Sequence, residues 1–202
     1  MTAASDIAII DAGGANIASL TFALGRLGVE GQLTTDAERI RAAERVILPG
    51  VGAARDAMDR LRASGLDTVI PTLEQPVLGI CLGLQLLFDG SEEADTRCLG
   101  ILPGTARLLE ADTEHTVPLM GWNRVWQSPN SQLLTDVPDG AQFYFVHSYA
   151  APVAAFTTGL CKHGVEFSAV VERGNFCATQ FHPERSGVHG SRVLANFLSK
   201  PS

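Results

Sequence analysis

A cysteine framed by two glycines has the clearest chemical signature in this sequence. The run Gly79-Ile80-Cys81-Leu82-Gly83 lies between an apolar stretch that predicts a strand and one that predicts a helix. This order is typical of a nucleophile elbow, in which a tight turn lifts the nucleophile clear of the sheet edge. A larger side chain at either glycine would crowd the strand against the helix. We therefore predict that Cys81 is a nucleophile at a helix N-terminus, where the helix dipole favours its thiolate.

A histidine and a carboxylate follow much later in the chain. His182 and Glu184 flank Pro183 after a predicted strand. In an extended chain, residues i and i+2 point the same way, so Glu184 can orient His182. Each feature alone has a simpler explanation, a surface His–Glu pair or a buried structural cysteine. Together they favour a Cys-His-acid triad, with His182 as general base and acid and Glu184 fixing its tautomer.

The other three cysteines, Cys98, Cys161 and Cys177, are expected to be buried structural residues. They are widely spaced, and no two cysteines form a C-x-x-C pair. This spacing supports neither a disulfide framework nor a zinc site, and the scattered histidines suggest no metal constellation. We predict no metal and no cofactor.

The composition is that of an ordinary globular protein. The 202 residues include 46% hydrophobic and 18% charged residues, and the net charge is −7. We expect a single domain over 1–202, and the lack of a Lys/Arg cluster argues against nucleic acid as a partner. No signal peptide is evident, and the longest apolar stretch is too short to span a bilayer. We expect a cytoplasmic protein with no membrane association, and a reducing setting suits a thiol nucleophile.

The elements that must position these residues differ between the two halves. The first half alternates strand and helix, which predicts a flavodoxin-like α/β fold with a mostly parallel central sheet flanked by helices. The second half predicts antiparallel additions to this sheet. Strands are expected at 7–11, 29–34, 45–48, 77–80, 106–109, 124–126, 142–146, 153–157, 167–172 and 176–179. Helices are expected after a cap at Asn16, through about Leu61, at 82–88 and at 188–198.

Two further segments lie where the site is expected. Gly50-Val51-Gly52 follows the strand next to the cysteine strand, and its backbone N–H groups, with that of Leu82, could form an oxyanion hole. An ordinary strand-to-helix turn explains this segment equally well. Gln85 lies four residues after Cys81 on the same helix face, where it would either bind a polar substrate group or face solvent.

Three other features are assigned no catalytic role. The segment Asp11-Ala12-Gly13-Gly14-Ala15-Asn16 lacks the G-x-G-x-x-G spacing of a dinucleotide loop. His147 ends a predicted strand and is expected to be structural. Trp122 and Trp126, near Met120, form either an exposed apolar patch for a partner or, as is commoner, part of the core.

Six motifs, in order along nearly the whole chain, resemble the class I (triad) glutamine amidotransferases. The closest resemblance is to the branch of glutaminase subunits that serve imidazole glycerol phosphate synthase. The motifs are Ile10-Asp11-Ala12-Gly13-Gly14-Ala15-Asn16, Pro49-Gly50-Val51-Gly52, the run from Gly79 to Gln85, Met120-Gly121-Trp122-Asn123, Phe145-Val146-His147-Ser148-Tyr149, and Gln180-Phe181-His182-Pro183-Glu184-Arg185-Ser186-Gly187. The chain departs from many relatives in the first motif, and at Leu119, where they often carry histidine.

The resemblance implies that the chain hydrolyses glutamine to glutamate through a thioester on Cys81. It also implies that the ammonia goes to a (β/α)8-barrel cyclase subunit, which makes imidazole glycerol phosphate and an aminoimidazole carboxamide ribotide. The residues that it assigns are Val51 and Leu82 to the oxyanion hole, Gly50, Gly52, Gln85, Ser148 and Tyr149 to substrate binding, and Asn16 and Trp122 to the partner interface. Alternatives are a glutaminase of another synthase, such as one making pyridoxal phosphate, a non-catalytic partner-binding homologue, or a cysteine hydrolase on a related fold.

Overall fold

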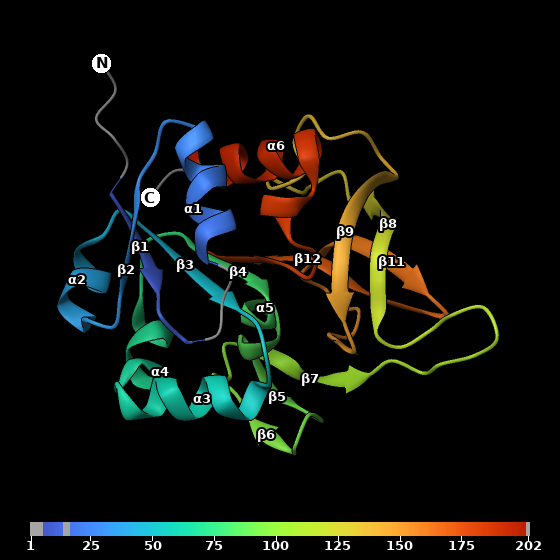
Figure 1. Cartoon of the computed structure of the whole chain (residues 1–202), viewed down its shortest axis with the longest axis horizontal. Helices are drawn as coiled ribbons and strands as arrows, with labels where there is room; N and C mark the ends of the chain where they lie inside the picture. Colours follow the sequence, from blue (N-terminus) through green and yellow to red (C-terminus); the bar gives the residue numbers. More distant parts are fainter. Residues whose placement is uncertain (1–5, 14–16, 201–202) are drawn as a thin grey trace.

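The computed structural model describes residues 6–13 and 17–200, and its core is a nine-stranded sheet (Figure 1). Five strands pair in parallel in the order β2-β1-β3-β4-β13. Their bounds are β1 (Ile7–Ile10), β2 (Gly31–Thr34), β3 (Arg45–Gly50), β4 (Val77–Cys81) and β13 (Phe176–Thr179). This order is that of a doubly wound α/β sheet, whose ligands bind outside the carboxyl ends of the strands.

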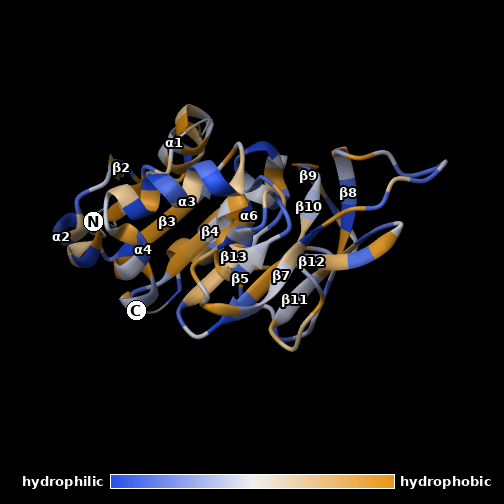
Figure 2. Ribbon diagram, turned by 90° about the horizontal axis from the view of Figure 1, so that it is seen from below, coloured by the Kyte–Doolittle hydropathy of each residue, from blue (hydrophilic) through white to orange (hydrophobic). Residues whose placement is uncertain are grey.

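Helices cover both faces of this parallel half. Along β1, Ile7 and Ile9 join the core beneath α1 (Ile17–Arg26) and α6 (Gly187–Leu198), because alternate side chains point to opposite faces. Ala8 and Ile10 join the core beneath the helices of the other face, which are α2 (Ala37–Ala42), α3 (Ala54–Ala63) and α4 (Leu66–Val69). Figure 2 shows the hydrophobic strands β3 and β4 beside helices that carry hydrophilic stretches.

Antiparallel strands extend the sheet beyond β13. They follow in the order β12 (Val165–Arg173), β11 (Thr157–His163), β8 (Leu119–Gln127) and β9 (Ala141–His147). A second, four-stranded sheet contains β10 (Tyr149–Ala150), β7 (Leu102–Leu108), β5 (Phe88–Ser91) and β6 (Thr96–Arg97). The predicted α/β fold with a parallel half and antiparallel additions is therefore confirmed.

Two predicted elements are wrong. The helix expected at 82–88 ends at Leu86, as α5 (Leu82–Leu86), because Phe88 is buried and begins β5, where it pairs with Leu102 of β7. The strand expected at 153–157 is a turn closed by a hydrogen bond from Thr157 N–H to the Ala154 carbonyl, and β11 begins only at Thr157. None of the helices in the described part of the chain is long and apolar enough to cross a membrane.

Candidate active site

Cys81 stands on a strained turn between β4 and α5. Its backbone has φ 55° and ψ −107°, a conformation that costs free energy in a residue with a side chain and persists where the surroundings enforce it. A Cβ added at Gly83 would lie 1.9 Å from the carbonyl oxygen of Leu48, and one at Gly79 would lie 2.9 Å from that of Gly83. Both glycines are therefore required by the close approach of β3, β4 and α5 around the cysteine.

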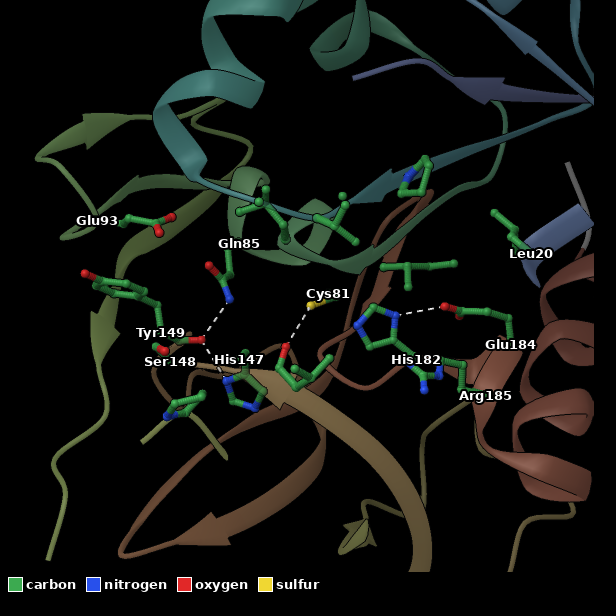
Figure 3. Close-up of a pocket in the computed structure, with 18 of the residues that line it drawn as sticks. Leu20, Cys81, Gln85, Glu93, His147, Ser148, Tyr149, His182, Glu184 and Arg185 are labelled. Carbon is green, nitrogen blue, oxygen red and sulfur yellow. Dashed lines mark hydrogen bonds and ion pairs between the residues drawn. The ribbon is translucent and has the colours of Figure 1, made fainter. Parts of the chain in front are cut away.

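The turn after β13 carries His182 and Glu184 to the same place. Nδ1 of His182 lies 2.8 Å from Oε1 of Glu184, and both side chains are buried. A carboxylate can only accept, so Nδ1–H donates to Glu184 and the other ring nitrogen, Nε2, faces the cavity beside Cys81 (Figure 3). Nε2 is buried and has no hydrogen-bond partner among the described residues.

Strand β9 anchors the segment that carries the histidine. The N–H of His182 donates to the Tyr144 carbonyl at 2.9 Å, and the N–H of Tyr144 donates to Oγ of Ser186 at 2.9 Å. Phe181 stacks on Phe143 with ring centroids 4.0 Å apart. The position of His182 is thus fixed by the antiparallel half of the sheet, although the residue follows a parallel strand.

The surroundings of His182 favour its protonated form. Burial by itself lowers the pKa of His182, but its interactions with Cys81 and Glu184 outweigh burial and raise the pKa to about 10. An imidazolium at neutral pH stabilises negative charge on the neighbouring sulfur. The surroundings of the other three cysteines favour the neutral thiol. Burial raises the pKa values of Cys98, Cys161 and Cys177 to about 11, 12 and 12.

A pocket of about 360 Å³ opens at the carboxyl ends of β3 and β4. This volume lies in the range of small-molecule sites, ~300–1,000 Å³. Ten residues predicted from the sequence line it together, namely Gly50, Val51, Gly52, Cys81, Leu82, Gln85, Ser148, Tyr149, His182 and Glu184. Of the two predicted interface residues, Asn16 lies outside the described residues, and Trp122 is half-exposed and does not line the pocket.

The segment after β3 approaches the cysteine turn closely. Gly50 is the register partner of Cys81, and a Cβ on Gly50 would lie 2.8 Å from the backbone nitrogen of Gly83. Gly52 has φ +90°, which favours glycine. The segment is therefore the short connection from β3 to α3 and also part of the pocket wall beside Leu82, so its two interpretations are compatible.

The alternative of a solvent-facing Gln85 is wrong, since this residue is 4% exposed. Its Nε2 donates to the Tyr149 carbonyl at 2.8 Å and to Oε1 of Gln180 at 3.2 Å. The two amide hydrogens are thereby committed to the protein. Only Oε1 of Gln85 is left for a polar group of a substrate.

One carboxylate of the pocket was missed by sequence reasoning. Glu93 lies in the turn between β5 and β6, and its Oε2 accepts from the N–H of Ala54 at 2.7 Å, at the start of α3. Glu93, Gln85 and Tyr149 lie on one side of Cys81, and His182 and Glu184 lie on the other (Figure 3). No motif surrounds Glu93, and only the path of the chain through β5 and β6 brings it to the site.

His147 lines the pocket but is tied into the core. Its Nδ1 lies 2.9 Å from the Tyr149 carbonyl, and its ring packs edge-on against Phe167. Burial lowers the pKa of His147 to about 4, so the ring is neutral at pH 7.

Strand β8 carries three large apolar side chains that are not in the core. Met120 is 65%, Trp122 53% and Trp126 43% exposed, so the prediction of core packing is wrong and the exposed patch is observed. In the described part of the chain, no group of three or more His, Cys, Asp and Glu residues is arranged to hold a metal ion.

Comparisons with known proteins agree on one family. The family model "Glutamine amidotransferase class-I" matches residues 8–201. The imidazole glycerol phosphate synthase subunit HisH of Xanthomonas campestris pv. campestris (strain 8004) is 54% identical over 96% of this chain and 97% of that protein. The protein of the same name from Xylella fastidiosa (strain Temecula1 / ATCC 700964) is 52% identical over the same shares.

Solved structures share the fold at low sequence identity. The crystal structure of a glutamine amidotransferase has a TM-score of 0.73 at 17% identity, covering 96% of this chain and 97% of that one. PurLQS from Thermotoga maritima has a TM-score of 0.70 at 19% identity, covering 96% of this chain and 98% of that one. These likenesses establish the fold alone.

Proposed function

The chain belongs to the class-I glutamine amidotransferase family, and from this premise we propose that it is the glutaminase subunit of an imidazole glycerol phosphate synthase. The observation that carries the proposal is Cys81 on a strained elbow beside the buried His182–Glu184 pair, in one pocket. Relatives of that name at 54% identity over 96% of the chain support the choice of synthase.

The proposed reaction begins with attack of the Cys81 thiolate on the side-chain amide carbon of glutamine. Backbone N–H groups of Val51 and Leu82 would hold the oxyanion, since both residues line the pocket beside the sulfur. The His182 imidazolium then gives a proton to the leaving ammonia, and a γ-glutamyl thioester remains on Cys81. Neutral His182 next takes a proton from water, which attacks the thioester and releases glutamate. Glu184 holds the imidazole in the required tautomer.

The side of the pocket opposite His182 suits the α-amino end of glutamine, which lies away from the amide that is hydrolysed. Glutamine carries an α-ammonium group, and Glu93 places a carboxylate on that side. We propose that Glu93 and Oε1 of Gln85 receive the ammonium. Gly50, Gly52, Ser148 and Tyr149 also line the pocket and complete the proposed substrate site.

The partner of the reaction would be a (β/α)8-barrel cyclase. Ammonia released into neutral water is mostly protonated, and ammonium is not a nucleophile, so a synthase needs a sealed route from one site to the next. The exposed side chains of Met120, Trp122 and Trp126 on β8 supply an apolar surface for docking. We propose Trp122, with Asn16 as a further contact, as part of this interface.

We further propose that residues 1–202 form one domain that works in the cytoplasm. The nine-stranded sheet supports the first point, because it contains strands from both halves of the chain. Four free cysteines support the second, because a reducing compartment keeps the proposed nucleophile as a thiol.

Glutamate release from glutamine by the purified chain, alone and with the separately purified cyclase and its nucleotide ligand, tests the proposal. We expect low release alone and a steep rise with the cyclase. Cys81→Ala should lower the stimulated rate by about 10³-fold or more, by analogy with removal of other catalytic nucleophiles. The matched change Cys98→Ala, at a cysteine outside the pocket, should retain most of the rate.

The other outcomes separate the alternatives. A high rate that ignores the cyclase would keep the glutaminase but assign it to another synthase. No release from the folded protein with the cyclase present would favour a non-catalytic partner-binding protein.

A further inference from the structure

A chain of side-chain amides runs beside the proposed nucleophile. Gln180, between β13 and His182, is fully buried, and a buried amide must find its hydrogen bonds within the protein. Its Oε1 accepts from Nε2 of Gln85 at 3.2 Å, and its Nε2 donates to Sγ of Cys81 at 3.8 Å. Nothing in the reaction described above uses this residue.

The direction of the chain is fixed by a backbone carbonyl. Nε2 of Gln85 lies 2.8 Å from the carbonyl oxygen of Tyr149, which can only accept, so the nitrogen of Gln85 and not its oxygen must occupy that position. The second hydrogen of this nitrogen then requires the oxygen of Gln180. A flipped Gln180 would bring two N–H donors together, so the nitrogen of Gln180 faces Cys81.

We propose that Gln180 is a positioning residue, which holds the sulfur of Cys81 and stabilises its thiolate through the Nε2–H donor. Hydrogen bonds to an ionised acceptor are stronger than hydrogen bonds to a neutral one, so this donor favours the thiolate over the thiol. On another side, the thiol donates to the Val146 carbonyl at 3.8 Å. The sulfur therefore has an acceptor for its protonated form and a donor for its ionised form. This role rests on the proposed function of Cys81 as nucleophile.

This chain of amides, formed by Gln85 and Gln180, also connects the sulfur of Cys81 with the wall of the pocket opposite His182. Its anchor is the carbonyl of Tyr149, and Tyr149 and Gln85 both line the pocket opposite His182. Cys81 thus has two independent supports. The imidazole of His182 exchanges a proton with the sulfur of Cys81. The chain of amides sets the position of the sulfur and stabilises its negative charge.

The test is the pH dependence of alkylation of Cys81 by iodoacetamide, followed by mass spectrometry of the cysteine peptides. It requires no glutamine and no cyclase. Gln180→Glu keeps an oxygen for Gln85 but replaces the donor with a carboxylate, and Gln180→Met removes the donor without adding charge. Gln32→Glu is the control, since it makes the same change on exposed β2, where Gln32 accepts from Arg39.

We expect the alkylation midpoint of Gln180→Glu to move to higher pH by about one unit, so that Cys81 reacts about tenfold more slowly at any pH below both midpoints. Gln180→Met should shift in the same direction by less, and Gln32→Glu should match the wild-type protein. A wild-type profile in both Gln180 variants overturns the proposal, and so does loss of the fold in both, which would make Gln180 a core residue only. If the midpoint shifts in the Gln180 variants but the wild-type protein releases no glutamate in the presence of the cyclase, the positioning role holds and the proposed glutaminase function fails.

Discussion

The two halves of the central sheet bury their side chains differently. In the parallel half, every residue of β1, β4 and β13 is buried, because helices cover both faces. In the antiparallel half, β9 alternates between buried and more exposed residues, and β8 presents Met120, Trp122 and Trp126 outward. The parallel half, buried on both faces, carries the cysteine turn. The antiparallel half, exposed on one face, carries the apolar surface that is available to a partner.

The two halves also position the two proposed catalytic residues, Cys81 and His182, by different kinds of contact. Cys81 is positioned by backbone packed on backbone, through Gly79 and Gly83. His182 is positioned by a hydrogen bond to Tyr144 and by the stacking of Phe181 on Phe143, both on β9. The position of the histidine therefore depends on contacts with β9, whereas that of the cysteine depends on the packing of β3, β4 and α5.

The largest expected effect contrasts the two faces of the antiparallel half. Phe143→Ala removes a fully buried ring that stacks on Phe181, and should lower the free energy of unfolding by about 4 kcal/mol. Trp122→Ala removes a half-exposed ring and should change it by no more than about 0.5 kcal/mol. Urea unfolding monitored by circular dichroism measures both. Equal losses would contradict the division into a buried and a free face.

A smaller loss is expected where backbone meets backbone in the parallel half. Gly83→Ala forces a methyl group to within 1.9 Å of the Leu48 carbonyl oxygen, so β3 and α5 must separate. We expect a loss of about 3 kcal/mol in the same measurement. Gly25→Ala, inside α1 with nothing within 4 Å of the added carbon, should instead stabilise the protein by about 0.5 kcal/mol. A tolerated Gly83→Ala would show that the cysteine turn is not tightly packed.

The last comparison concerns two histidines whose pKa values are shifted in opposite directions, and its effect appears only at acidic or alkaline pH. The pKa of His147 is lowered from 6.5 to about 4, mainly by burial and also by the charges of His163 and His182. Below pH 6.5 the unfolded chain binds this proton and the folded protein does not, so stability is lost as the pH falls toward 4. Over this range we expect the wild-type protein to lose about 3 kcal/mol more than His147→Gln does.

His182 should show the reverse sign. Its pKa is raised from 6.5 to about 10, so its contribution to stability is present below pH 6.5 and is lost as the pH rises toward 10. His182→Gln should therefore lose less stability than the wild-type protein on the alkaline side. Thermal melting temperatures across pH 4–10 measure both slopes, and parallel curves for wild type and variants would contradict the assigned environments.

The sequence was most predictive where local patterns decide the structure. The apolar strand, the glycines around Cys81 and the His-Pro-Glu segment predicted the elbow and its neighbours, because each is a requirement of a few adjacent residues. The limits of α5 were missed because Phe88 enters the small sheet through its pairing with Leu102, a contact that no local pattern encodes. Helix α2 was missed although Asp36 caps it by accepting from the N–H groups of Glu38 and Arg39.

Features that depend on contacts between distant parts of the chain could not be predicted from local sequence patterns. Glu93 reaches the pocket through the path of β5 and β6, and Gln180 meets Gln85 and Cys81 only across the sheet. The exposure of Trp122 depends on which elements pack over that face of β8, and these are set by contacts between distant parts of the chain. Hydrophobic residues in alternation predict a strand, but not which of its faces is left for a partner.

Covalent labelling with a diazoketone analogue of glutamine would identify the nucleophile of the site. The folded chain, with the barrel cyclase and its nucleotide ligand present, would be treated with the analogue and digested for mass spectrometry. We expect one adduct, on Cys81, that excess glutamine prevents and that Cys81→Ala abolishes. An adduct on Cys98, Cys161 or Cys177, or no adduct on the folded protein, would contradict the assignment of Cys81 as the nucleophile.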